Sequence, residues 1–128
     1  MYASFVVRPD FSRPDFDAFR DYCRHLGLNF ASFAVLTPLP GTDLYEQVKD
    51  QLLTRNYDIF DFIHTLLPTT LPLKEFYKEY RRLYQEAVPV RRQLSLLRKF
   101  PLREIPGWVL KGERFYKRLS TIHLDYAP

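Results

Sequence analysis

The sequence has very little cysteine, with Cys23 the only one in 128 residues. An internal disulfide framework, a cysteine-based zinc site and a self-contained iron–sulfur cluster each need several thiolates, so one cysteine excludes all three. There are also only four glycines. The G-x-G-x-x-G, P-loop, G-x-S-x-G and H-E-x-x-H motifs do not occur, so the enzyme classes that they define are not indicated.

Long hydrophobic runs are missing as well. No apolar run approaches the roughly 20 residues of a membrane-spanning helix. The first residues lack the basic and apolar regions of a signal peptide. Together with the single cysteine, these absences predict a soluble or peripheral protein of a reducing compartment, the cytoplasm.

Apolar residues make up 46% of the chain and aromatic residues 16%. A chain of this size can bury about two-thirds of its surface, which supports one core. Charge is uneven: residues 1–61 carry six Lys/Arg and nine Asp/Glu, whereas residues 62–128 carry 13 and six. A basic half suits phosphate, a nucleic acid or an anionic membrane, and a merely solvated basic surface is the alternative.

Residues 2–8 and 30–37 are predicted strands, because both are short runs rich in apolar, β-branched and aromatic residues. A helix is predicted between them. It begins after Ser12, with Asp15 completing a capping box, and Gly27 ends it. Its apolar residues recur with helical spacing at Phe16, Phe19, Cys23 and Leu26. This order predicts a right-handed strand–helix–strand unit with parallel strands.

Residues 37–42 (TPLPGT) form the sharpest break in the sequence, and Thr42 is placed to cap a helix that continues to about Leu52. Residues 56–67 fit either a strand or an irregular buried segment. Helices with apolar faces are predicted over residues 73–87, 90–100 and 108–119. The tail from Ser120 is expected to be loose.

The predicted fold class is therefore α/β. Residues 1–55 supply two or three parallel strands with their helices, and residues 56–128 form a mostly helical extension. So few parallel strands leave an apolar sheet edge exposed, and a full (β/α) barrel takes about 250 residues. We expect the chain to be the C-terminal piece of a larger α/β domain, or to complete its sheet with a partner chain.

Two candidate sites follow the predicted strands, where α/β folds place their ligands. Arg8 suits a carboxylate or phosphate, and an ordinary ion pair with Asp10 is the alternative. The helix start at Gly41 and Thr42 suits an anion.

A third candidate is His64, which has Asp61 three residues before it. On a helix these two side chains share a face, and a carboxylate-oriented histidine is a common acid–base group or metal ligand. A hydrogen-bonded structural histidine is the more frequent alternative.

The fourth candidate is the basic, aromatic C-terminal third. Such a surface stacks on bases or lies on an anionic bilayer. No recognised nucleic-acid motif accompanies it, so a nucleic-acid partner is not expected.

The TPLPGT turn also carries a family resemblance. Residues 3–48 resemble the last strands of a radical S-adenosylmethionine (radical SAM) barrel, which a T-P-x-P-G-T turn often follows. Tyr57-Asp58, then His64, then Pro68 resemble the continuation in the cobalamin-binding branch of that superfamily. The segments FVVRPDFSRPDF and FDFIHTLLPTTLPLKEFYKEY are most similar to the hopanoid C-3 methylase group.

This resemblance implies the C-terminal fragment of a partial (β/α) barrel followed by a helical extension. For the full-length protein it implies S-adenosylmethionine, a 4Fe–4S cluster, cobalamin and methyl transfer to an unactivated carbon. By analogy, His64 lies on the substrate side and four residues line the cofactor pocket: Arg8, Leu36, Thr37 and Pro38.

The family's C-x-x-x-C-x-x-C motif and cobalamin domain are missing from this chain. We therefore expect the chain alone to hold no cofactor and to be inactive, with the missing N-terminal barrel half or a partner subunit as its partner. A stand-alone interaction or lipid-surface module derived from the barrel end is the alternative.

A membrane lipid as substrate would require a docking surface, and residues 106–119 are predicted to form it. The apolar residues expected together on that helix are Ile105, Trp108, Val109, Phe115, Tyr116 and Leu119. The basic residues expected to flank them are Lys111, Arg114, Lys117 and Arg118. The predicted location is then the cytoplasm, peripheral at the inner membrane.

Overall fold

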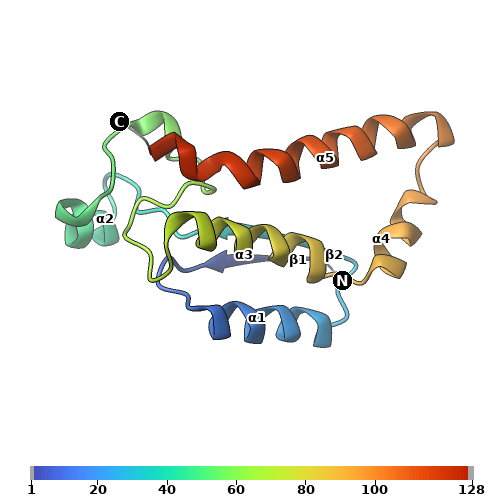
Figure 1. The fold of residues 1–128 in the computed structure, drawn as a ribbon, viewed down its shortest axis with the longest axis horizontal. Coiled ribbons are helices and arrows are strands. Elements are labelled where there is room, and N and C mark those ends of the chain that lie inside the picture. The colour runs from blue at the N-terminus through green and yellow to red at the C-terminus, as the bar shows by residue number, and fades with distance from the viewer. Residues whose placement is uncertain (1, 127–128) are drawn as a thin grey trace.

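The computed structural model describes residues 2–126 and has α/β architecture with mostly helical content (Figure 1). The strands are β1 (Tyr2–Val7) and β2 (Phe30–Val35). The helices are α1 (Arg13–His25), α2 (Asp43–Val48), α3 (Leu73–Glu86), α4 (Val90–Leu97) and α5 (Ile105–Thr121). Short 3₁₀ turns cover Lys49–Gln51, Tyr57–Ile59, Leu102–Glu104 and Ile122–Tyr126. The predicted fold class is confirmed at this level, whereas the division of the chain at residue 55 stays a prediction.

The two strands pair in parallel, in register from Tyr2 opposite Phe30 to Val7 opposite Val35. This confirms the strand–helix–strand unit. Each strand ends one or two residues earlier than predicted. Pro9 and Pro38 follow these ends, and proline has no N–H with which to extend a ladder.

Helix α1 begins and ends where the sequence predicts. The Ser12 hydroxyl accepts a hydrogen bond from the Asp15 N–H, and the Asp15 carboxylate accepts one from the Ser12 N–H. Gly27 has a φ of +64°, a conformation that glycine adopts without strain. Phe16 and Cys23 are fully buried, so the predicted apolar face points into the core.

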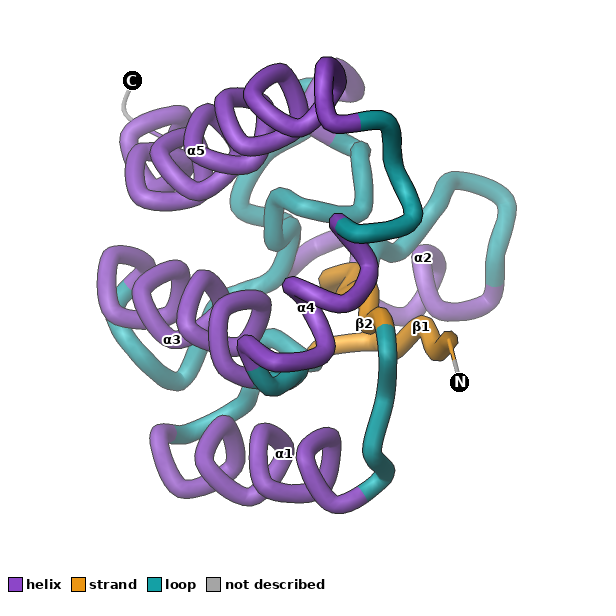
Figure 2. The backbone as a smooth tube through the Cα atoms, turned by 90° about the vertical axis from the view of Figure 1, so that its right-hand side faces the viewer, coloured by secondary structure: helices purple, strands orange, loops and turns teal. Residues whose placement is uncertain are grey.

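Helices α1 and α3 cover one face of the sheet. Figure 2 shows α1 and α5 on opposite sides of the molecule, with α3 and the strands between them. Phe33 of β2 is buried there, in contact with Phe19 and Tyr84. On the other face of the sheet, Tyr2, Val6 and Phe30 are exposed. A strand as apolar as residues 30–37 is typically covered on both faces of its sheet, but the described chain covers only one.

Helix α3 closes the outer edge of β2 with side chains. Four side chains on the apolar face of this helix are fully buried: Phe76, Tyr77, Tyr80 and Leu83. The Tyr80 and Tyr84 hydroxyls each donate to the Phe33 carbonyl at 2.6 Å, and the Tyr84 oxygen accepts from the Phe33 N–H at 3.0 Å. These two tyrosines take the place of a neighbouring strand.

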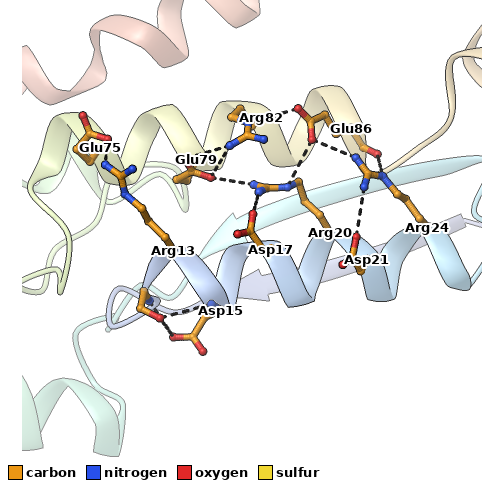
Figure 3. Close-up of polar contacts among 11 residues, drawn as sticks. Arg13, Asp15, Asp17, Arg20, Asp21, Arg24, Glu75, Glu79, Arg82 and Glu86 are labelled. Atoms are coloured by element: carbon orange, nitrogen blue, oxygen red, sulfur yellow. Dashed lines mark hydrogen bonds and ion pairs between the residues drawn. The ribbon is translucent and has the colours of Figure 1, made fainter.

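A row of ion pairs joins α1 to α3 (Figure 3). Arg20 lies buried at its centre and contacts Glu79 at 2.9 Å, Glu86 at 3.5 Å and Asp17 on its own helix. Burial acts to raise the pKa of the Glu79 carboxyl, but the Arg20 and Arg82 guanidiniums outweigh it and hold that pKa below its usual range. The apolar spacing of α1 gave no indication of a buried arginine on this helix.

The C-terminal part differs most from the prediction. Residues 56–67 form an irregular segment with one 3₁₀ turn, but the burial that this option predicted holds only for residues 64–66. Helix α5 begins three residues earlier than predicted, with Pro106 in its first turn. The expectation of a loose tail from Ser120 is wrong up to Tyr126: Ile122 is buried, and the Tyr126 hydroxyl donates to the Thr65 carbonyl at 2.7 Å.

Among residues 2–126, no helix is both long enough and apolar enough to cross a membrane.

Candidate functional site

A cavity of about 210 Å³ lies at the carboxyl ends of the two strands. Two of the predicted cofactor-site residues, Arg8 and Leu36, line it together. The other lining residues are Pro9, Asp10, Gln51, Leu67 and Pro68. Strand ends in α/β folds meet at one edge and form ligand sites there, which is why residues 28 positions apart reach the same cavity.

Hydrogen bonds from the irregular segments hold the walls of this cavity. The Thr70 N–H donates to the Pro9 carbonyl at 3.3 Å, and the Thr70 hydroxyl donates to the Asp10 carbonyl at 2.9 Å. The Leu36 N–H donates to the Val7 carbonyl at 2.9 Å. The loop after β1 is thereby fixed against both β2 and the segment before α3.

Arg8 is the only cationic side chain among the residues that line this cavity. Its guanidinium forms an ion pair with Asp10 at 2.6 Å, which is the alternative that the sequence indicated for Arg8. Both side chains are exposed. One such pair leaves other guanidinium N–H groups free to bind a carboxylate or phosphate, since arginine has five.

Thr37 and Pro38 do not line this cavity and are instead buried beside it. The Thr37 hydroxyl donates to the Val35 carbonyl at 3.0 Å, which stabilises the end of β2. Their predicted role as cofactor contacts stays a prediction.

His64 lies buried between two carboxylates. Its Nδ1 is 2.8 Å from Asp61, so the expected pair forms, but on an irregular segment and not on the helix for which the spacing placed the two side chains on one face. Asp61 is oriented by the backbone N–H groups of Ile63 and His64, which donate to it at 3.0 and 2.9 Å. Nε2 is 2.6 Å from Asp125, a partner that sequence reasoning missed.

Hydrogen bonds lower the pKa of both carboxyl groups. Arg118 donates to Asp125 and lowers its pKa, and the His64 ring adds to that effect. Partial burial acts to raise the pKa of Asp61, but the hydrogen bonds from His64 and Ile63 outweigh it, so that pKa is also lowered. Both ring nitrogens of His64 are engaged, so this arrangement ties the C-terminal segment to residues 61–65. The predicted substrate-side role of His64 stays a prediction.

The described residues do not fit an iron–sulfur cluster. Within residues 2–126, no group of three or more His, Cys, Asp or Glu side chains is placed to hold a metal ion. Cys23 lies on the buried face of α1, and burial raises the pKa of its thiol, which disfavours the thiolate that a metal needs.

The strand-end cavity, at about 210 Å³, is smaller than the roughly 300–1,000 Å³ of most small-molecule sites. Its residues can therefore line one part of a larger site.

The two curated relatives that match the chain are both named for methyl transfer. The chain is 32% identical over 124 residues to the hopanoid C-3 methylase of Methylococcus capsulatus, covering 96% of this chain and 24% of that protein. It is 31% identical over 88 residues to the bacteriochlorophyllide d C-12(1)-methyltransferase of Chlorobaculum tepidum, covering 65% of this chain and 19% of that protein.

These matches confirm the resemblance to the hopanoid C-3 methylase group. The chain spans about a quarter of the length of the first relative and about a fifth of the second. No family model matches the chain, and no solved structure matches it.

Proposed function

We propose that the chain is the C-terminal part of a cobalamin-dependent radical SAM methyltransferase. The observation that carries this proposal is the similarity to hopanoid C-3 methylase over 96% of the chain. The parallel β1–α1–β2 unit supports an origin at the end of a (β/α) barrel, because α1 covers one face of the sheet and the other face is free. The exposed face would then line the barrel interior. S-adenosylmethionine, a 4Fe–4S cluster and cobalamin belong to the full-length protein, and hopanoid C-3 methylation is the proposed reaction.

The two edges of the sheet support a proposed partner. The outer edge of β2 is closed by Tyr80 and Tyr84, and the Val35 N–H donates to the Phe62 carbonyl at 2.6 Å. In the described chain, the outer edge of β1 has no backbone hydrogen bond to another element. We propose that a parallel strand of the N-terminal barrel half, or of a partner subunit, pairs with β1. Without that half the chain is inactive.

In this proposal the residues at the strand ends bind and orient the cofactor. Arg8 holds an anionic group of the cofactor, and Asp10 keeps the guanidinium turned toward the cavity. Leu36 packs against the apolar part of the ligand, while Thr37 and Pro38 fix the loop. The protein works in the cytoplasm, peripheral at the inner membrane. The alternative, a stand-alone interaction or lipid-surface module, shares that location but involves no methyl transfer.

A chimera tests the proposal. The segment of the M. capsulatus hopanoid C-3 methylase that matches this chain is replaced by residues 2–126, and 3-methylhopanoid is measured in cells that make hopanoids. The chimera should form product, and the relative without the segment should form none. An Arg8→Gln chimera should lose activity while keeping its iron content. An inactive chimera that is soluble and carries its full cluster would refute the proposal.

Purified chain alone provides the second test. Anaerobic reconstitution with iron and sulfide should leave no charge-transfer absorbance after desalting. A stoichiometric cluster that survives desalting would show that the cofactor part of the proposal is wrong.

A further inference from the structure

We infer that α4, the connection 98–104 and the first half of α5 form an arm that docks on an anionic membrane surface. The side chains around Trp108 enter the lipid interface. This inference rests on the peripheral location in the proposed function and not on methyl transfer.

The arm projects from the core. Figure 1 shows α5 reaching past the end of α3, with α4 and the connection at the far end. None of the residues of α4 is buried, and in α5 only Leu119 is buried, near the C-terminal end. Phe115 packs on Tyr84 of α3 with ring centroids 5.1 Å apart. The part of α5 before Phe115 therefore lies beyond the packed core.

Large apolar side chains gather at the end of this arm, here called the apolar tip. Its exposed members are Phe100, Leu102, Trp108, Val109 and Leu110, with exposed fractions from 41% to 85%. The Phe100 and Trp108 rings lie 5.3 Å apart. Single exposed apolar residues are ordinary, but a group of five close along the chain marks an interaction surface.

The charge around the apolar tip determines which partner fits. Residues 98–114 contain two acidic residues and five basic ones, Arg98, Lys99, Arg103, Lys111 and Arg114. Within the described chain, none of these five forms an ion pair, so their charge is available to an external anion.

A shallow hollow of about 340 Å³ lies at the apolar tip, between Arg103, Glu104, Gly107, Trp108 and Lys111. The Lys111 ammonium is 5.4 Å from the centre of the Trp108 ring. Two cations beside an amphipathic indole suit a lipid phosphate, with aliphatic side chains beside it to enter the acyl region.

The structure corrects the docking surface expected from the sequence. Leu119 is buried and Tyr116 is half-buried, so these two side chains face the protein. Arg118 is engaged with Asp125. The surface shifts toward the start of α5 and gains Phe100 and Leu102, which the helical pattern of residues 106–119 did not include.

The apolar tip contains its own probe, because Trp108 is the only tryptophan of the chain. Purified chain is mixed with vesicles of phosphatidylcholine, with and without phosphatidylglycerol, at low salt. With anionic vesicles the tryptophan emission should shift to the blue and its quenching by acrylamide should fall. Neutral vesicles should give neither change. About 1 M salt shortens the Debye length to ~3 Å and should reverse the binding.

Charge variants give the quantitative test. Each basic residue near an anionic surface contributes about 1 kcal/mol, so Arg103→Gln, Lys111→Gln and Arg114→Gln combined should weaken binding on the order of 100-fold. The matched control removes three exposed charges elsewhere, Arg55→Gln, Lys74→Gln and Lys78→Gln, and should bind nearly as the parent does. A Leu102→Ser, Leu110→Ser variant should reduce both binding and the emission shift, with unchanged circular dichroism.

Three outcomes would overturn the inference. They are no emission shift with anionic vesicles at low salt, equal binding by the charge variant and its control, and a blue shift that grows with protein concentration without vesicles. The last would assign the apolar tip to a second copy of the chain. The chimera assay measures methyl transfer separately, so failure of docking and failure of the proposed function are distinguishable.

Discussion

Removing Arg20 should destabilise the protein more than any substitution at an exposed ion pair. The side chains of Arg20 and Glu79 are 3% and 5% exposed. After Arg20→Met, the Glu79 carboxylate stays buried, with Arg82 at 3.3 Å as its remaining cation in the ion-pair row. Breaking a buried pair costs about 3–5 kcal/mol. Because Arg82 is partly exposed and compensates in part, we expect a loss of about 3 kcal/mol.

Glu79→Gln should cost less. Arg20 keeps Asp17 and Glu86 as partners, and the glutamine oxygen still accepts a hydrogen bond. The loss should be about 1.5 kcal/mol, in the range for a hydrogen bond to a charged group. The double variant Arg20→Met, Glu79→Leu leaves no unpaired buried charge at this position and should return to within about 1 kcal/mol of the parent.

Urea unfolding followed by circular dichroism measures these free energies, with a constant m-value as the condition for comparing them. The exposed pair Arg13–Glu75 is the control, and Arg13→Met should cost about 0–1 kcal/mol. The reasoning fails if Arg20→Met costs no more than that control. It also fails if the double variant is less stable than Arg20→Met alone.

Three further predictions concern stability. Tyr84→Phe leaves the buried Phe33 N–H without its acceptor and should cost about 1–3 kcal/mol in urea unfolding, whereas the exposed Tyr22→Phe should change little. Arg118 lowers the pKa of Asp125 in the folded protein. The contribution of Asp125 to the free energy of unfolding is therefore complete above the unfolded pKa of about 3.9 and is lost as pH falls below that value. Acid titrations should therefore show a smaller stability loss for Asp125→Asn than for the parent. Burial raises the pKa of Tyr77 to about 12. The contribution of Tyr77 to the free energy of unfolding is therefore present below pH ~10 and is lost as pH rises toward 12. A free energy of unfolding that stays constant over that interval would contradict this prediction.

Local patterns were enough to predict the first forty residues. The Ser12–Asp15 capping box and the left-handed Gly27 depend on neighbours along the chain, and both occur as predicted. The parallel pairing follows from chain connectivity, which constrains a short strand–helix–strand unit strongly. Arg8 and Leu36 share a cavity for the same reason, since both follow parallel strands.

Contacts between distant segments could not be predicted from these patterns. Asp125 reaches His64 across 61 residues, and no spacing rule connects them. Arg20 is buried because two carboxylates of α3 face it, whereas an isolated helical pattern assigns arginine to solvent. Leu67 and Pro68 were not predicted at the cavity because they come from a segment without regular periodicity, and Gln51 because the helical pattern of residues 42–52 does not show where the end of that segment lies relative to the strands.

The closure of β2 by Tyr80 and Tyr84 limits how far this sheet can grow. A head-to-tail filament needs an open strand edge at both ends of each copy, but this sheet is open only along β1 in the described chain. Two copies that meet through β1 are related by a twofold axis, and their combined sheet then ends at β2 on both sides. Pairing between copies of this chain therefore stops at a closed dimer. That dimer competes with any partner strand for the outer edge of β1.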